Sequence, residues 1–243
     1  MFRTRLSAAL TVGVAAVALA ACATAGTPTA APGSPSTDVM PAADKVLSAV
    51  KSAADKASAV HVKGHLVEGG SALTLDVQMN KDGSGSGTIG EDNQTFSLII
   101  AHQVDYIQFT KDLISAAGLS PSTPPGSLLL NKWVPSTSKL MAGSDLSDTF
   151  KEVSFSAFIP EVFGDLSGDT PKEAGTSTVD GVPVHIYKSS DGTAYVATAA
   201  PHYLIRLVEA PSSGNGQVDF TGWDKPVKIS PPPAAEIYSG PGS

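Results

Sequence analysis

The sequence predicts an α+β fold: a large, curved antiparallel sheet of about 10–11 strands, with a helix filling its concave side. Three observations predict it. After residue 58 the apolar period changes from 3.6 to 2. The chain then alternates strand-length runs with turn signals in two antiparallel meanders. A helical, aromatic stretch separates the meanders, whereas βαβ units would place a long helix between successive strands.

The first folded element is an amphipathic helix over residues 44–58. Its apolar face combines Val46, Leu47 and Val50 with three alanines, and its lysines fall elsewhere. Small side chains allow such a helix to lie close against a sheet.

The first meander predicts five strands joined by short turns. Gly69-Gly70-Ser71 and Asp82-Gly83 are turn signals between alternating runs. The predicted strands cover residues 60–67, 73–79, 85–89, 95–101 and 104–109.

The middle of the chain is different in kind. Residues 110–130 form a Pro-rich loop, and a short strand follows at 132–134. Residues 145–166 show helical patterning with many aromatic side chains, and Pro160 is expected to kink or interrupt that helix.

The second meander again shows strands separated by strong hairpin signals, among them Asp180-Gly181 and Asp191-Gly192. A last strand is predicted at residues 227–229, before three prolines that cannot continue a ladder. The other strands of this meander cover residues 173–179, 182–188, 193–198, 203–209 and 216–221.

The N-terminus predicts an exported lipoprotein. Arg3 and Arg5 precede an apolar run at residues 8–19, which is shorter than the roughly 20 residues that span a bilayer. Leu19-Ala20-Ala21-Cys22 then looks like the bacterial lipobox. We therefore expect a signal peptide at residues 1–21 and palmitate-type acyl chains on Cys22, which anchor the protein to the extracytoplasmic face of the cell membrane. The alternative is an ordinary signal peptide with an incidental cysteine.

The predicted domain organisation follows from composition. Residues 22–42 are rich in Ala, Thr, Pro, Gly and Ser and are expected to form a disordered tether after Cys22. One folded domain follows at residues 43–233, and residues 234–243 form a C-terminal tail. Because Cys22 is the only cysteine, the chain can form no internal disulfide.

The charge of the chain argues against nucleic-acid binding. The 16 basic residues include Arg3 and Arg5, so 14 remain after cleavage against 23 acidic residues, a formal net charge of −9. An acidic domain repels a phosphate backbone.

Catalytic and metal-binding motifs give no support for an enzyme. Gly-x-Ser-x-Gly, His-Glu-x-x-His and phosphate-loop patterns are absent from the sequence. Ser136-x-x-Lys139 fits a penicillin-binding pattern but lacks its companion motifs. His61 and His65 would lie roughly 13 Å apart on a strand, too far to share a metal. We expect no cofactor and no metal.

Seven segments carry a recognisable family pattern: residues 58–62, 104–107, 131–133, 179–187, 194–196, 203–207 and 220–229. Together they resemble the mycobacterial LppX/LprG lipoprotein family. The resemblance covers most of residues 43–233 as an order of elements, and residues 110–130 depart from the family pattern. It implies a LolA/LolB-like fold, a half-open barrel wrapped around helices, with an apolar cavity for acyl chains. It also implies a role in binding or carrying lipids or glycolipids in the cell envelope, with envelope transport proteins as partners.

The predicted lipid-cavity lining combines apolar strand rows with the aromatic helix. An acyl chain needs a dry apolar cavity with a few polar groups at its rim. The same side chains could instead pack only against each other, as the core of an envelope interaction protein without a ligand. The predicted lining residues are Leu73, Leu75, Val77, Phe96, Leu98, Ile100, Tyr106, Phe155, Phe158, Ile159 and Phe163.

Overall fold

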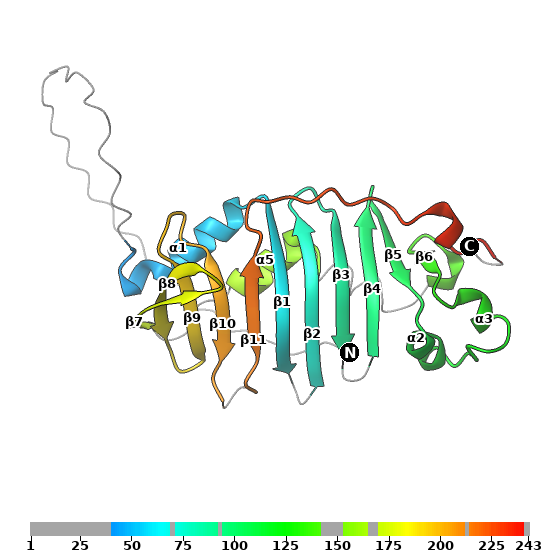
Figure 1. Ribbon diagram of the computed structural model, residues 1–243, viewed down its shortest axis with the longest axis horizontal. Coiled ribbons are helices and arrows are strands. Elements are labelled where there is room, and N and C mark those ends of the chain that lie inside the picture. The colour runs from blue at the N-terminus through cyan, green and yellow to red at the C-terminus, as the bar shows by residue number, and fades with distance from the viewer. Residues whose placement is uncertain are drawn as a thin grey trace, which may run out of the picture. The chain divides into compact units, whose positions relative to one another are not determined.

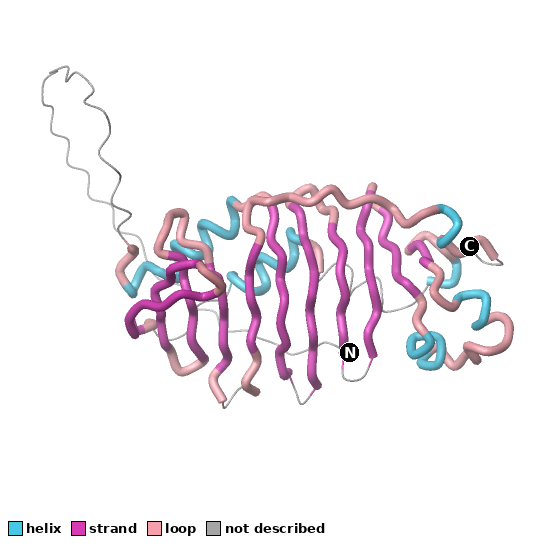
Figure 2. The backbone as a smooth tube through the Cα atoms, in the orientation of Figure 1, coloured by secondary structure: helices cyan, strands magenta, loops and turns pink. Residues whose placement is uncertain are grey.

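A computed structural model describes residues 40–68, 71–91, 94–141, 153–164, 170–211 and 214–240. These residues build one curved sheet of eleven antiparallel strands, with helices beside it (Figures 1 and 2). The two outermost strands do not pair with each other, so the sheet is unclosed. The predicted fold class is therefore confirmed. Cys22, the predicted signal peptide and nearly all of the tether lie outside the described residues.

The sheet order shows how the two meanders combine. It runs β6-β5-β4-β3-β2-β1-β11-β10-β9-β8-β7. Each predicted strand other than residues 227–229 is present, with ends shifted by at most two residues. The strands are β1 (Ala59–Glu68), β2 (Ser71–Asn80), β3 (Gly85–Glu91), β4 (Gln94–Ala101), β5 (Val104–Gln108), β6 (Trp133–Pro135), β7 (Lys172–Val179), β8 (Val182–Lys188), β9 (Gly192–Ala197), β10 (Leu204–Glu209) and β11 (Gln217–Thr221).

A single seam joins the two meanders. β1 pairs with β11, and the register places His61 opposite Thr221, 160 residues later in the chain. Every other neighbouring pair in the sheet consists of strands that are consecutive in sequence. The centre of the sheet therefore contains the first and the last strand of the chain.

Two helices lie on the same face of the sheet, and we call this the inner face (Figure 1). α1 (Ala43–Lys56) is the predicted amphipathic helix, and its buried residues include Val46 and Val50. α5 (Phe155–Gly164) is the described part of the predicted aromatic helix. It continues through Pro160, so the predicted interruption does not occur.

The segment predicted as a Pro-rich loop is more ordered than expected. It contains two short helices, α2 (Lys111–Ala116) and α3 (Gly126–Leu129), and the 3₁₀ helix η1 (Lys139–Met141) follows β6. Thr110 caps α2, because its side chain accepts a hydrogen bond from the Leu113 N–H. A six-residue helix with a cap and one buried apolar side chain gives too weak a periodic signal to be recognised in sequence.

The predicted strand at residues 227–229 is wrong. Residues 222–240, which we call the C-terminal strap, run along the ends of β1 to β5 (Figure 1). Both backbone groups of Val227 bond to the buried Asn80 side chain: its N–H donates to Oδ1 at 3.2 Å and its C=O accepts from Nδ2 at 2.8 Å. A side-chain amide thus replaces the strand partner. The strap contains the 3₁₀ helix η2 (Ala234–Glu236) and reaches β6, where Ile237 forms a parallel bridge with Trp133.

Candidate ligand-binding face

The inner face carries a row of side chains that are all buried. The row crosses seven strands from β11 to β6, and α5 packs against it. Phe163 of α5 contacts Phe220 edge to face, with 5.6 Å between ring centroids. All its side chains are buried, and Gly87 supplies none. We call this row the packed row: Phe220, Val62, Val77, Gly87, Leu98, Ile107 and Val134.

A second row on the same face is equally apolar but less covered. It lies two residues along each strand, toward the end where β1 stops and β2 begins. Leu75 and Phe96 are only half-buried there, as are Leu66 and Leu73 one step further. Side-chain burial therefore falls toward this end of the sheet along β2 and β4, whereas Val218 and Ile89 stay buried. We call this row the inner apolar row: Ala194, Leu207, Val218, Gly64, Leu75, Ile89 and Phe96.

α5 divides its side chains between the two environments. Phe155, Ile159 and Phe163 are four residues apart, and all three are buried. Phe158 and Val162 lie on an adjacent stripe and are half-buried against the core. The helix thus fixes the sheet through one stripe and leaves a second apolar stripe partly accessible.

The register places six of the predicted lining residues of the sheet on the inner face. Val77 and Leu98 belong to the packed row, and Ile100 lies beside it. The remaining three are half-buried. They are Leu73, Leu75 and Phe96.

The expectation for Tyr106 needs correction. Tyr106 pairs with Ile99, whereas its neighbour Ile107 pairs with the inner residue Leu98. Since successive side chains of a strand point to opposite faces, Tyr106 lies on the face away from the helices. It does not share a face with the other predicted lining residues.

Two glycines of the inner face were not recognised in the sequence. A Cβ added to Gly64 would lie 2.1 Å from the Gln217 carbonyl oxygen, and one added to Gly87 would lie 2.1 Å from the Asp76 carbonyl oxygen. Neither position has room for a side chain, because the neighbouring strand approaches too closely. Glycine in these strands permits that approach and leaves gaps in both rows of side chains.

One acidic side chain also occupies the inner face. Asp105 pairs with Ile100 and is half-buried near the start of β5. Burial raises the pKa of its carboxyl group. The Ser136 hydroxyl accepts a hydrogen bond from the Asp105 N–H at 3.4 Å, so two polar side chains lie at this margin of the apolar surface.

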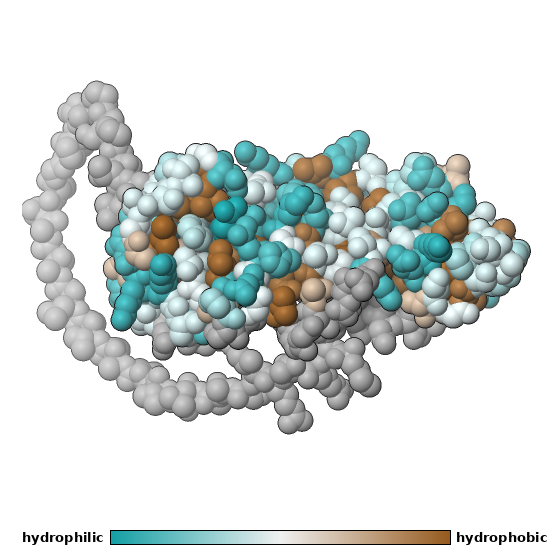
Figure 3. Space-filling model, turned by 60° about the horizontal axis from the view of Figure 1, so that its bottom comes forward, coloured by the Kyte–Doolittle hydropathy of each residue, from teal (hydrophilic) through white to brown (hydrophobic). Residues whose placement is uncertain are grey.

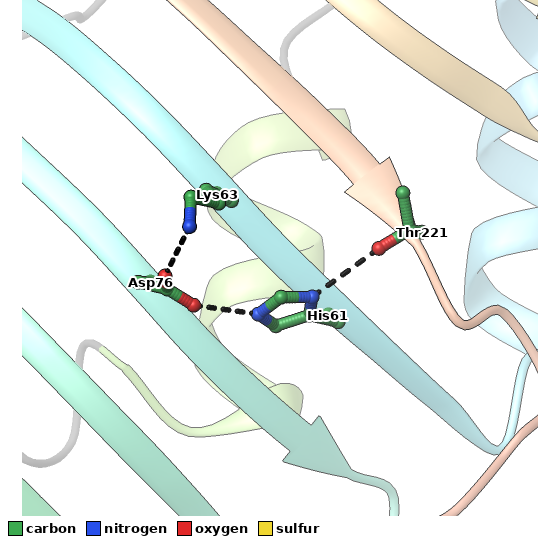
Figure 4. A network of polar contacts seen from close by, with 4 residues as sticks. All are labelled: His61, Lys63, Asp76 and Thr221. Carbon is green, nitrogen blue, oxygen red and sulfur yellow. Dashed lines mark hydrogen bonds and ion pairs between the residues drawn. The ribbon is translucent and has the colours of Figure 1, made fainter. Parts of the chain in front are cut away.

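The opposite, outer face is held by polar contacts. His61 Nε2 lies 2.7 Å from Asp76 Oδ1, and Lys63 Nζ donates to Asp76 Oδ2 at 2.7 Å (Figure 4). His61 Nδ1 lies 3.3 Å from Thr221 Oγ1. The hydrogen bonds from Lys63 and His61 lower the pKa of Asp76. This network links β2, β1 and β11 across the seam, which gives His61 a structural explanation.

Arg206 and Asp219 extend the polar outer face to the other side of the seam. They pair across β10 and β11, and Arg206 also lies 3.2 Å from Asp180. The carboxylate of Asp219, through its hydrogen bond, raises the pKa of Arg206. The two faces of the sheet therefore differ in chemistry, one apolar and covered by helices, the other polar and solvated.

Searches for other kinds of site give no candidate in the described part of the chain. No three His, Cys, Asp or Glu side chains there gather closely enough to hold a metal ion. No described helix has the length and hydropathy that crossing a bilayer requires.

Solved structures that are remotely similar to this chain include two mycobacterial lipoproteins. The crystal structure of LprF from Mycobacterium bovis is 14% identical and covers 78% of this chain and 96% of its own, with a TM-score of 0.45. The crystal structure of the Mycobacterium tuberculosis lipoprotein LppX is also 14% identical and covers 77% of this chain and 98% of its own, with a TM-score of 0.46. Likeness at this level decides neither family membership nor ligand. No protein-family model and no curated protein sequence match the chain.

Proposed function

We propose that this protein binds a lipid or glycolipid on the inner face of its sheet and carries or presents it within the cell envelope. The observation that supports this most is the inner apolar row, which spans seven strands and keeps Leu75 and Phe96 half-exposed. A monomeric domain rarely leaves contiguous apolar surface accessible unless something binds there.

The physical chemistry of an acyl chain fits this surface. Removing a sixteen-carbon chain from water is favourable by about 12 kcal/mol, at about 0.8 kcal/mol per methylene group. The chain needs no directional partner, so a wall of Leu, Ile, Val and Phe suffices. A bilayer offers nearly the same free energy, and exchange with it is therefore practicable only for a protein held nearby.

The N-terminal sequence supports such proximity. Acyl chains on Cys22 would hold the protein on the extracytoplasmic face of the membrane. Residues 23–42 would act as a flexible tether with a root-mean-square span of roughly 25 Å. The lining that we propose consists of the half-buried residues Leu66, Leu73, Leu75, Phe96, Phe158 and Val162, together with the buried side chains beneath them.

A second candidate, an envelope interaction protein with a filled interior, draws on the packed row. There Val62, Val77 and Leu98 are already almost completely buried. On this reading the inner apolar row would be covered by protein, and the domain would work through its surface.

Lipid extraction and native mass spectrometry of the unlipidated chain test the proposal. We expect co-purified or loadable lipid, and a Leu75→Trp variant should reduce the loaded fraction because the indole occupies ligand space. Ile99→Trp is the matched control, since Ile99 is half-buried on the outer face of the adjacent part of the sheet. A protein that takes up no lipid would leave the filled-interior function standing.

A further inference from the structure

We propose that residues 109–141, which we call the end lobe, dock onto an anionic membrane surface. The end lobe contains α2, α3, β6 and η1 and lies at the β6 edge of the sheet (Figure 1). The inference goes beyond the proposed ligand site, because it concerns how the folded domain touches the bilayer and does not require a cavity.

The end lobe is a folded part of the domain with buried side chains of its own. Ile114 of α2 and Leu129 of α3 are almost completely buried, and Met141 closes η1 against the same core. The lobe therefore has an apolar interior of its own, in which further leucine side chains could be buried.

Three leucines of the end lobe nevertheless face solvent. Leu128 is 51% exposed, Leu140 41% and Leu130 36%. The described residues expose only two other large apolar side chains, Val182 and Val227. Apolar surface accordingly interrupts the hydrophilic surface at this end of the molecule (Figure 3). A concentration of exposed leucines on short helices suits insertion into the headgroup region of a bilayer.

The charge of the end lobe is opposite to that of the protein as a whole. Residues 109–141 contain three lysines, Lys111, Lys132 and Lys139, and a single acidic residue, Asp112, whereas the full chain has a formal net charge of −7. Lys132 Nζ bonds to the Ala235 carbonyl in the strap, and the other two lysines are exposed. Exposed leucines with lysines beside them complement an anionic lipid surface.

The end lobe lies far along the sheet from the point where the tether joins the fold. The tether enters the fold next to β8, where the Tyr187 hydroxyl bonds to the Pro41 carbonyl oxygen at 3.4 Å. β8 and β6 lie nine inter-strand spacings apart in the sheet order, a path of about 43 Å along the sheet. A membrane contact at the lobe would add a second attachment far from the first, so that the sheet lies along the bilayer.

A second copy of the chain is the competing occupant of the exposed leucines of the end lobe. In an isologous contact between two lobes, the lysines of both copies would face one another and repel. An anionic membrane surface attracts the same lysines, so the local charge of the lobe favours the membrane.

Vesicle co-sedimentation of the chain without residues 1–22 tests the docking. All described core residues remain in this protein, which removes the anchor and leaves the lobe as the membrane contact. Vesicles of equal parts phosphatidylglycerol and phosphatidylcholine should bind the protein, and binding should weaken with salt; phosphatidylcholine alone should bind it less. Replacing the three leucines by Gln should weaken binding at least about tenfold, from lost apolar burial. Lys111→Gln and Lys139→Gln should each weaken it about fivefold.

The controls replace exposed apolar and lysine side chains that lie outside the lobe. Val182→Gln with Val227→Gln, and Lys225→Gln with Lys228→Gln, should leave vesicle binding unchanged. Equal losses of vesicle binding in the lobe and control variants would overturn the proposal. The proposal would also be overturned if the leucine variant lost self-association in analytical ultracentrifugation but kept its vesicle binding. Lipid loading, measured on the same proteins, stays independent: loaded lipid without vesicle docking would refute the lobe contact and leave the proposed function intact.

Discussion

The packed row and the inner apolar row lie on the same face and share five strands, where they are two residues apart, yet their environments differ. Val77 and Leu98 are almost completely buried, whereas Leu75 and Phe96 are only half-buried. Residue type does not distinguish the rows, because both consist of aliphatic and aromatic side chains with one glycine each. The rows differ in how fully the rest of the chain covers them, so one apolar sheet face can contain both a core and a candidate binding surface.

The largest expected effect comes from the packed row. Leu98→Ala should lower the free energy of unfolding by about 3 kcal/mol, since it removes a fully buried side chain and leaves a cavity. Urea denaturation measures this loss. Ile99→Ala, on the outer face next to it, is the control and should cost much less. Equal losses at both positions would mean that the packed row is no better sealed than the outer face.

Glycine substitutions should affect the two rows alike. Gly87→Ala and Gly64→Ala should each cost about 2 kcal/mol, because the added Cβ forces the neighbouring backbone to move. The urea midpoint of each variant gives the measurement, with Ser86→Ala as a neighbouring control on the outer face. If Gly87→Ala lowered the urea midpoint and Gly64→Ala did not, packing above the sheet, and not the close approach of the strands, would determine the loss of stability.

A truncation in the inner apolar row should separate stability from binding. Leu75→Ala should cost less than Leu98→Ala, about 1–2 kcal/mol, because the Leu75 side chain is only partly buried. The same variant should reduce lipid loading, as native mass spectrometry can quantify. If its stability loss matches that of Leu98→Ala, Leu75 belongs to the core and the two rows are one.

The smallest effect is expected on the outer face, which serves as the polar reference for both rows. Asp76 has a folded-state pKa below its ordinary value of about 3.9, so its contribution is present above about pH 4 and is lost as the pH falls through the folded-state pKa. In Asp76→Asn, the free energy of unfolding should therefore vary less with pH below about pH 4. The change should be less than about 1 kcal/mol, because the Lys63–Asp76 pair is exposed. Urea titrations at several pH values measure it, and an unchanged curve contradicts the assignment.

Sequence periodicity was sufficient for most of the sheet because strands with one buried face alternate strictly. Turn signals sufficed where burial does not alternate: on either side of Asp180-Gly181, the prediction for residues 182–188 matches β8 at both ends, and that for 173–179 misses one residue of β7. Periodicity also predicted that Leu73, Leu75 and Val77 share a face.

The errors arose where the alternating pattern is ambiguous or where distant contacts decide. β5 has apolar side chains in both phases, so only its pairing with Leu98 shows that Ile107, and not Tyr106, faces inward. Val227 is extended and apolar, but Asn80 holds it in place of a strand. The difference in burial between Leu75 and Val77 depends on which distant parts of the chain cover the sheet, which no local pattern encodes.

The seam between β1 and β11 has a consequence for how the molecule folds. The strand that completes its middle, β11, follows all ten other strands in the sequence, and closing a loop of this length is entropically costly. Until β11 pairs with β1, the two meanders have no strand to unite them. We therefore expect the pairing of β1 with β11 to be the slow step that turns two separate meanders into one sheet.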